Sequence, residues 1–395
     1  MNILELIGRK SELFDRDIEK NRNEINRLIQ ENRFLVIGGA GSIGKAVVKE
    51  IFKRNPLKLH VVDISENNLV ELVRDLRSTY GYIDGDFRTF ALDVGSKIYD
   101  AFIEADGAYD FVLNLSALKH VRSEKDPFTL MRMIEVNILN TVKTVEQSIS
   151  KGVKKYFCVS TDKAANPVNL MGASKRIMEL YLSDLGEHIS ISSARFANVA
   201  FSDGSLLHSF EERLKQNHPI VAPTDVKRYF VTPGESGILC LMSCLFGEKG
   251  DTYFPKLDEK EHLISFTEIA NKFLTEKGYQ PVYCSSEEEA RESVLTLKNQ
   301  KQWPCFYSSS DTTGEKPFEE FYMDNEAVFL DKYQDLGIVR KPLIVEKELL
   351  EKFRNEINGF INRGVWSKSD IVQLFQMLLP ELNYEDKGKY LDAKM

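Results

Sequence analysis

Residues 34–44 read Phe34-Leu35-Val36-Ile37-Gly38-Gly39-Ala40-Gly41-Ser42-Ile43-Gly44, and this stretch decides the fold. Its apolar first part, 34–37, predicts a buried strand, and the glycines predict a tight turn into a helix over 43–54. A second predicted strand, 59–62, ends at Asp63. This order of strand, glycine turn, helix, strand and acid is typical of a dinucleotide-binding fold.

The glycine turn and the acid each have a mechanical reason. Glycines let the backbone turn tightly and approach a pyrophosphate, whose charge lies at the positive end of the following helix. Asp63 comes nineteen residues after Gly44, close to the separation of about 20 expected for an acid that binds the adenosine ribose. A carboxylate there repels a 2′-phosphate, and no basic residue intervenes before Arg74, so we expect NAD rather than NADP.

Strands and helices continue to alternate beyond this unit. Further strands are predicted over 88–92, 109–115 and 156–160, with a long helix over 130–150. The pattern predicts an α/β fold with a Rossmann-type doubly wound parallel sheet, which binds ligands beyond the carboxyl ends of its strands. The cofactor-binding residues expected in the glycine turn and at these ends are Gly38, Gly41, Ser42, Ile43, Gly44, Asp63, Ser65, Asp93, Val94, Asn114, Ser116, Ala117 and Ser160.

Composition excludes several classes of protein. The 395 residues carry 52 basic and 60 acidic side chains, a net charge of −8, which argues against a nucleic-acid-binding surface. No apolar run approaches the roughly 18 residues of a membrane span, and the N-terminus has no signal-peptide core, so we expect a cytoplasmic protein without a membrane span. The five cysteines are scattered, which argues against a disulfide framework. Cys240 and Cys244 have apolar neighbours and are predicted core residues, and no metal site is expected.

We divide the chain into four regions. These are an N-terminal helical arm (1–32), an NAD-binding Rossmann domain (33–200), a smaller α/β substrate-binding region (201–339) and a C-terminal helical extension (340–395). The arm is predicted as a helix over 11–32 with an apolar stripe of Phe14, Ile18, Ile25, Leu28 and Ile29. Helices predicted over 346–361 and 369–379 have one apolar face, which packs against the main domain or in the homo-oligomer that we expect.

A second informative stretch, 160–175, reads STDKAANPVNLMGASK. It follows the predicted strand 156–160, turns at Asn166-Pro167 and enters a helix that begins near Gly172 and places Met171 and Lys175 on one face. An acid, a lysine and a hydroxyl therefore lie at a strand end and face a second lysine. From these residues alone, a catalytic site and a set of solvated charges are both open.

These residues resemble the extended short-chain dehydrogenase/reductase family, which has a Gly-x-x-Gly-x-x-Gly turn and a Tyr-x-x-x-Lys pair. The turn matches at Gly38, Gly41 and Gly44, and the lysine at Lys175, whereas Met171 stands in place of the tyrosine. Within that family, the 160–175 stretch resembles nucleotide-sugar 4,6-dehydratases of bacterial polysaccharide synthesis. The branch most similar is that of the UDP-N-acetylglucosamine 4,6-dehydratases, one subgroup of which carries methionine at this place.

The resemblance covers roughly residues 30 to 325. Further matches are 117–121 (ALKHV), Asn137, 195–199 (RFANV), 225–230 (DVKRYF) and Gly314-Glu315-Lys316. Four departures stand out: Ala197 replaces a usual glycine, Asp203 lies where relatives tend to be basic, Thr312-Thr313 stands where many members have Arg-Pro, and 284–311 looks like an insertion.

The resemblance implies the following chemistry. A 4,6-dehydratase moves a hydride from C4 of the sugar to NAD, eliminates water across C5 and C6, and returns the hydride to C6. Lys163 is then the base for C5 and Asp162 the acid for the C6 oxygen, which requires a neutral lysine and a protonated aspartate. Both side chains reach one sugar only if the chain turns between them. The other implied site residues are Thr161 at the C4 hydroxyl, Lys175 at the nicotinamide ribose, Asn137 at the cofactor, and Lys119, Asn198 and Arg228 at the UDP-sugar.

Met171 has no proton to exchange with the C4 hydroxyl, so Thr161 takes the place of the missing phenol. In the resembling branch methionine accompanies retention at C5, and we therefore expect retention. Two alternatives stay open: a 4-epimerase, whose reaction depends on the tyrosine, and a catalytically silent nucleotide-binding module. We assign His120 no role.

Overall fold

The computed structural model describes residues 2–310, 319–340, 346–386 and 388. Its main body is a nine-stranded sheet in the order β14-β15-β10-β6-β5-β4-β1-β2-β3. The strands from β10 to β3 are parallel, and β15 and β14 add an antiparallel edge. The bounds are β1 Arg33–Ile37, β2 Lys58–Asp63, β3 Asp86–Ala91, β4 Phe111–Asn114, β5 Lys155–Val159, β6 Ser190–Ala194, β10 Asp251–Pro255, β14 Ala327–Phe329 and β15 Leu336–Arg340.

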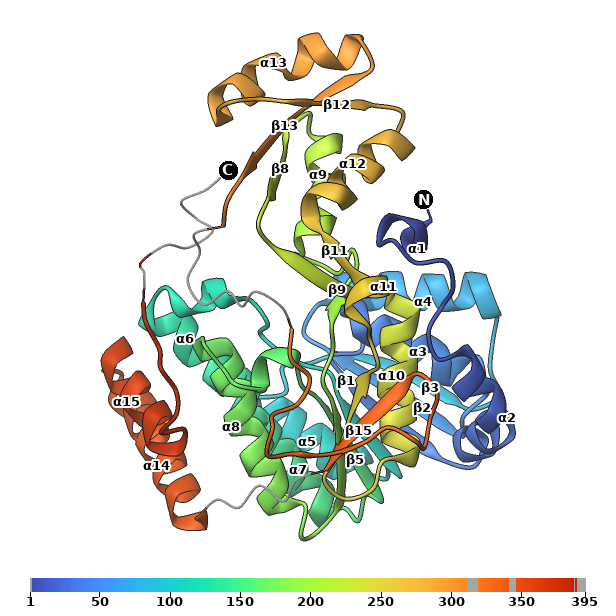
Figure 1. Ribbon diagram of the computed structural model, residues 1–395. Helices are drawn as coiled ribbons and strands as arrows, with labels where there is room; N and C mark the ends of the chain where they lie inside the picture. Colours follow the sequence, from blue (N-terminus) through green and yellow to red (C-terminus); the bar gives the residue numbers. More distant parts are fainter. Residues whose placement is uncertain (1, 311–318, 341–345, 387, 389–395) are drawn as a thin grey trace.

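Helices cover both faces of this sheet, as the predicted doubly wound fold requires (Figure 1). Because successive residues of a strand point to opposite faces, Phe34 and Val36 of β1 belong to one apolar core, and Leu35 and Ile37 belong to another. The first core includes residues of α3 and α10, and the second includes residues of α5, α7 and α8. These helices are α3 Ser42–Phe52, α4 Glu66–Tyr80, α5 Lys97–Asp106, α7 Asn140–Ser150, α8 Leu170–Leu185 and α10 Pro233–Phe246.

The helix predicted over 130–150 is a composite. It comprises α6 (Pro127–Ile134), a π-helical segment (Glu135–Leu139) and α7. It begins earlier than predicted because Asp126 caps it, accepting hydrogen bonds from the N–H groups of Phe128 and Thr129, and Pro127 occupies the first turn. The π segment carries Asn137.

A smaller part of the molecule, drawn above the main body in Figure 1, contains two three-stranded sheets. One joins β11 (Leu263–Ser265), β9 (Lys227–Val231) and β7 (Asn198–Val199). The other joins β12, β13 and β8, and its strands are parallel. The apparent insertion is therefore part of the fold, because it supplies α13 and β13. The remaining bounds are α9 Leu206–Lys215, β8 Ile220–Pro223, α11 Glu259–His262, α12 Phe266–Glu276, β12 Gln280–Tyr283, α13 Glu287–Asn299 and β13 Gln302–Ser308.

The N-terminal arm consists of α1 (Ile3–Leu6) and α2 (Asp15–Gln30). The predicted start of the long helix at residue 11 is wrong, because Phe14 has a left-handed backbone conformation, with φ of 73°, that ends the preceding loop. The Phe14 side chain is fully buried all the same. Arg9, in the loop between the helices, pairs with the fully buried carboxylate of Glu235 at the start of α10, and one of its bonds measures 2.7 Å.

The C-terminal helices, α14 (Lys347–Arg363) and α15 (Lys368–Leu378), pack against the same chain. Phe353 and Phe375 are fully buried and share an apolar cluster with Leu170 and Ile177 of α8. The apolar faces of both helices therefore pack against the main domain of the same chain. Cys240 and Cys244 are buried core residues of α10, as predicted. No helix within the described ranges combines the length and apolar character that crossing a membrane requires.

The anchoring of the arm can be tested at Arg9. We expect Arg9→Ala to lower the free energy of unfolding by about 3–5 kcal/mol, because Glu235 would remain buried without its partner. Arg22→Ala is the matched control, since Arg22 and Glu19 form an exposed pair, and it should cost less than about 1 kcal/mol. Urea denaturation measures both. Equal effects of the two substitutions would contradict the proposed anchoring.

Candidate functional site

The glycine turn between β1 and α3 has one open position. A Cβ atom on Gly44 would lie 2.2 Å from the carbonyl oxygen of Gly38, and one on Gly38, where φ is 70°, would lie 2.7 Å from the backbone nitrogen of Ser116. At Gly41 the nearest atom would be 3.6 Å away. Close packing therefore requires Gly38 and Gly44. Gly41 instead leaves space at the N-terminus of α3, where Ser42 and Ile43 begin the helix.

Asp63 at the end of β2 holds this turn in place. One carboxylate oxygen accepts a hydrogen bond from the N–H of Ala40, and the other accepts one from the N–H of Ser65, both at 2.9 Å. Ser65 then caps α4 through its side chain. The acid that the sequence assigns to the ribose is thus also a structural link between the turn and the next strand.

The other predicted cofactor residues lie at neighbouring strand ends. Asn114 accepts from the N–H of Ser116, which precedes Ala117, and it donates to Thr141. Asp93 accepts from the N–H of Gly95, and the carbonyl of Val94 accepts from Lys143. Asn137 is fully buried. Its amide binds the backbone of Leu118 and the hydroxyl of Ser174, so it joins the loop after β4 to α8.

The catalytic pair predicted at 162–163 lies on one tight turn. Asp162–Ala164 forms a single turn of 3-10 helix, with Thr161 as its cap. The Nζ atom of Lys163 lies 3.2 Å from Asp162 Oδ2, and the hydroxyl of Thr161 donates to Asp162 Oδ1 at 2.8 Å. The turn that the sequence required is present, and it brings all three side chains together. The carboxylate of Asp162 is almost completely buried, with 6% of the side chain exposed.

Helix α8 begins at Leu170, slightly before the predicted Gly172, because Asn169 caps it. Lys175 is buried, its Nζ donates to the carbonyl of Val159 at 3.1 Å, and burial lowers its pKa. Met171 is also buried, within the apolar cluster around Leu170. The N–H of Met171 donates to Glu124 at 2.7 Å, and burial raises the pKa of this carboxyl group to about 7. Glu124 was not predicted from the sequence.

Two of the three predicted substrate residues gather around a fourth side chain, Glu319. Asn198 on β7 donates from its amide to Glu319 Oε1, and the Nε of Arg228 on β9 lies 3.6 Å from the same oxygen. The third predicted residue, Lys119, instead donates from its Nζ to the hydroxyl of Ser202 at 3.2 Å. The neighbouring Asp203 accepts from the hydroxyl of Ser42 at 2.9 Å, which links the loop after β7 to the glycine turn.

Glu319 was missed by the sequence reasoning. Its side chain is 2% exposed, and its second oxygen accepts from the N–H of Tyr229 at 3.3 Å. Burial and then the charge of Asp162 raise its pKa to about 7, against the opposing charges of Arg228 and Lys163. The only signal in the sequence was its position shortly after the Gly314-Glu315-Lys316 match, which lies outside the described residues together with Thr312-Thr313.

The sequence matches the family model for "Polysaccharide biosynthesis protein" over residues 34–340. The chain belongs to this family. A relative from Methanocaldococcus jannaschii, named an uncharacterized membrane protein, is 29% identical over 80% of this chain and 88% of its own length. The capsular polysaccharide biosynthesis protein CapD of Staphylococcus aureus is 32% identical over 61% of this chain, but the match spans only 41% of CapD.

The similar proteins include relatives named for two different activities. An inverting UDP-N-acetylglucosamine 4,6-dehydratase of Campylobacter jejuni is 25% identical over 79% of this chain and 88% of its own length. A UDP-glucose 4-epimerase of Rickettsia massiliae is 27% identical over 77% of this chain and 86% of its own length. Family membership therefore does not distinguish dehydration from epimerisation, and the argument must come from the residues of the site.

Solved structures support the fold. Pen from Bacillus thuringiensis superposes with a TM-score of 0.65 at 23% identity, covering 83% of this chain and 98% of its own. The dTDP-glucose 4,6-dehydratase DesIV from Streptomyces venezuelae, solved with NAD bound, has a TM-score of 0.54 at 16% identity, covering 73% of this chain and 88% of its own. These likenesses confirm the Rossmann-type α/β fold.

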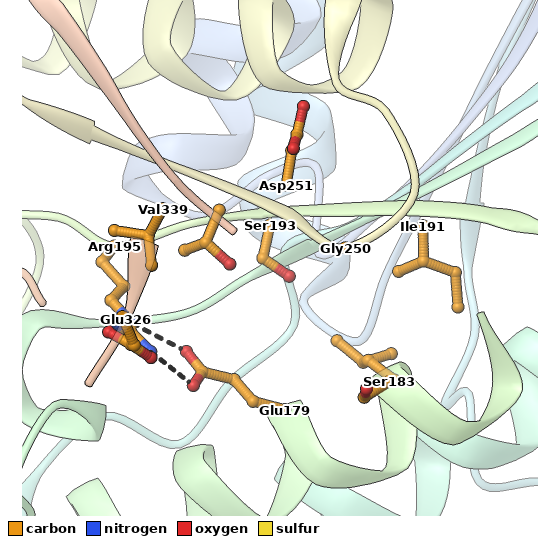
Figure 2. Close-up of a pocket in the computed structure, with 11 residues that line it drawn as sticks. Glu179, Ser183, Ile191, Ser193, Arg195, Gly250, Asp251, Glu326 and Val339 are labelled. Carbon is orange, nitrogen blue, oxygen red and sulfur yellow. Dashed lines mark hydrogen bonds and ion pairs between the residues drawn. The ribbon is translucent and has the colours of Figure 1, made fainter. Parts of the chain in front are cut away.

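A buried cluster of charges contacts Ser160, the residue before the turn at 161–163. Arg195 at the end of β6 donates to both oxygens of Glu179 on α8, at 3.0 and 2.8 Å, and to both oxygens of Glu326. Figure 2 shows Arg195 and Glu326 together facing Glu179. Burial alone would raise the pKa of Glu179, but Arg195, Arg176 and the hydroxyl of Ser160 outweigh burial and lower it to about 2. No predicted site residue lines the pocket drawn in Figure 2.

The two roles assigned to the glycines predict different effects of the same substitution. We expect Gly44→Ala to lower the free energy of unfolding by about 3 kcal/mol, because its Cβ would meet the backbone of Gly38 and Gly39. Gly41→Ala should cost less than about 1 kcal/mol, because Gly41 is the extended N-cap of α3 and has space around it. Chemical denaturation compares the two variants. A larger loss of stability from Gly41→Ala would contradict this division of roles.

Proposed function

We propose that the chain is an NAD-dependent nucleotide-sugar 4,6-dehydratase that converts UDP-N-acetylglucosamine to the UDP-4-keto-6-deoxy sugar for surface polysaccharide or glycan synthesis. The observation that carries this proposal is the single turn that holds Thr161, Asp162 and Lys163 in mutual contact. An elimination needs an acid and a base at neighbouring carbons, and adjacent residues on a tight turn meet that need. Membership of a polysaccharide biosynthesis family supports the assignment.

The protein has residues suited to hold NAD. Gly41 leaves open space at the positive end of α3, which suits a pyrophosphate, and Asp63 at the end of β2 suits the adenosine ribose. The buried Lys175 of α8 brings its amino group to the carbonyl of Val159 at the end of β5, a place that suits the nicotinamide ribose. Bound NAD would accept a hydride from C4 and return it at C6. The carboxylate of Asp63 disfavours the 2′-phosphate of NADP.

The elimination requires a neutral Lys163 and a protonated Asp162, which is the reverse of their charges in an ion pair. Their direct contact allows one state to convert to the other. The ion pair holds the same number of protons as a neutral acid beside a neutral base. Moving one proton from Lys163 Nζ to Asp162 therefore prepares both groups. Lys163 then takes the C5 proton, the C5–C6 double bond forms, and the C6 oxygen leaves as water with the proton of Asp162. The step ends with the original ion pair.

A 4-epimerase is the second candidate, since relatives with that name have similar identity. Epimerisation at C4 removes and returns one hydride at the same carbon and relies on a side chain that exchanges the hydroxyl proton. Met171 is buried in an apolar cluster and has no such proton. Epimerisation also gives no role to an acid and base paired on one turn. A silent binding module gives no role to this pair either.

The proposal is tested at Lys163. Incubation with UDP-N-acetylglucosamine in heavy water should give a 4-keto product with deuterium at C5, as measured by NMR. Lys163→Ala should slow C5 exchange roughly 100-fold or more, because the base is lost. Lys154→Ala removes an exposed lysine and should leave the rate unchanged. An interconverted hexosamine would support the epimerase instead, and absence of turnover with NAD bound would support the silent module.

The configuration of the product is a separate prediction. We propose retention at C5, because Met171 stands where the tyrosine of the inverting branch would be. The Campylobacter jejuni relative is named as an inverting enzyme, so the result distinguishes this chain from that relative. Coupling constants around C5 in the NMR spectrum of the product report the configuration. An inverted C5 would show that Met171 does not predict the stereochemistry.

A further inference from the structure

Two side chains hold the first turn of α8. Asn169, the residue before the helix, accepts a hydrogen bond from the N–H of Gly172 at 2.8 Å. Glu124, which ends a single turn of 3-10 helix over Val121–Glu124, accepts one from the N–H of Met171 at 2.7 Å. The first N–H groups of a helix have no acceptor within the helix, so these two bonds fix the place where α8 begins.

The bond to Met171 explains why a glutamate stands at position 124. The residue is completely buried, and its Oε2 atom has no hydrogen-bond partner in the described part of the chain. Burying a carboxyl group with one oxygen unpaired costs free energy that an apolar side chain would avoid. The Oε1 atom, however, supplies an acceptor to an N–H group of α8 that is otherwise without one.

The first turn of α8 also packs against the backbone of the turn at 161–163. A Cβ atom on Gly172 would lie 2.3 Å from the carbonyl oxygen of Lys163, so the two backbones leave no room for a side chain between them. Gly172 directly follows Met171, whose N–H is bound by Glu124. A shift in the start of α8 therefore displaces the backbone of Lys163 or removes its support.

The segment that carries Glu124 is held on both sides. Before it, the N–H of Leu118 donates to Asn137 at 2.9 Å. After it, the indole of Trp366 donates to the carbonyl of Pro127 at 2.9 Å, and the Trp366 ring meets the Phe128 ring edge to face. Glu124 thus connects α8 to a segment that has its own anchors.

We propose that Glu124 is a positioning residue for the elimination: its buried carboxyl group holds the first turn of α8 and, through Gly172, keeps the backbone of Lys163 in the place from which its side chain reaches the sugar. This inference rests on the proposed 4,6-dehydratase function. Glu124 exchanges no proton with the substrate, and its contribution is the acceptor that it offers to Met171.

The test compares three substitutions of Glu124. In Glu124→Ala the N–H of Met171 loses its acceptor, and we expect kcat for the 4-keto product to fall roughly tenfold or more, because small displacements of a catalytic group are costly. KM should change by less than about twofold, since Asn198 and Arg228 lie on other strands. Rates are measured well below the melting temperature of each variant, so that a loss of stability alone leaves kcat unchanged.

The other two substitutions separate the acceptor from the charge. Glu124→Gln keeps an acceptor oxygen, and its amide nitrogen replaces an oxygen that has no partner, so kcat should stay within about twofold of the wild type. Glu124→Asp keeps the charge but is one methylene shorter, and it should lower kcat roughly threefold or more. This milder variant also provides the test if Glu124→Ala does not fold.

Hydrogen exchange with mass spectrometry reports the same bond without turnover. A peptide that covers the start of α8 should exchange the Met171 amide roughly tenfold faster in Glu124→Ala than in the wild type, and Glu124→Gln should keep the protection. Glu289→Ala is the matched control, because Glu289 also accepts a backbone N–H at 2.7 Å, that of Ser285 just before α13. It should change neither kcat nor exchange in α8.

The outcomes separate the inference from the function on which it rests. An active wild-type enzyme whose kcat survives both Glu124→Ala and Glu124→Asp would overturn the role of Glu124 and leave the dehydratase assignment intact. An equal loss of kcat in Glu124→Ala and Glu124→Gln would also overturn it. A wild-type enzyme that forms no 4-keto product would overturn the dehydratase assignment itself. Loss of kcat in Glu124→Ala with recovery in Glu124→Gln supports the inference.

Discussion

The geometry of the site depends on Arg195. Its buried guanidinium group binds Glu179 of α8, Glu326 and the carbonyl of Phe321, and Glu179 also accepts from Ser160 at 2.7 Å. One cation therefore connects four segments: the end of β6, the helix that carries Lys175, the residue before the turn at 161–163, and the segment that follows Glu319. Bringing these charges out of water costs several kcal/mol per ion, and only complete pairing offsets that cost. The cluster therefore permits little variation in how the four segments meet.

The charge on the turn at 161–163 is compensated within the turn itself. Asp162 is nearly inaccessible, and an isolated carboxylate there would be costly. Lys163 lies in contact with it, and the hydroxyl of Thr161 donates to it, so the charge is compensated locally. In the proposed reaction this compensation is also the source of reactivity, since the ion pair and the neutral acid–base pair differ by the position of one proton.

The parts of the fold that sequence could predict are those fixed by local rules. Glycine geometry and strand alternation specified β1, the turn, α3 and β2, and the proline at 167 with the acid and lysine before it specified a turn where the structure has one. Glu319 could not be predicted, because its hydrogen-bond partners lie 121 and 90 residues away in the sequence. The C-terminal helices were predictable as amphipathic, but nothing local indicated that α8 would be their partner. Phe14 gave a different kind of error. Its apolar side chain fits the spacing of the predicted helix, but its left-handed backbone places it just before that helix.

Met171 shows how packing can decide chemistry. It belongs to the apolar cluster that α14 and α15 help to form around the start of α8, and a thioether suits that environment because it needs no hydrogen-bond partner. A phenol pointing into the same cluster would bury a hydroxyl group that requires one. In the proposed reaction, proton transfer at the C4 hydroxyl would instead fall to Thr161, whose hydroxyl donates to Asp162 at 2.8 Å. In the proposed enzyme, the start of α8 thus serves as core, and the proton chemistry is concentrated on the turn at 161–163.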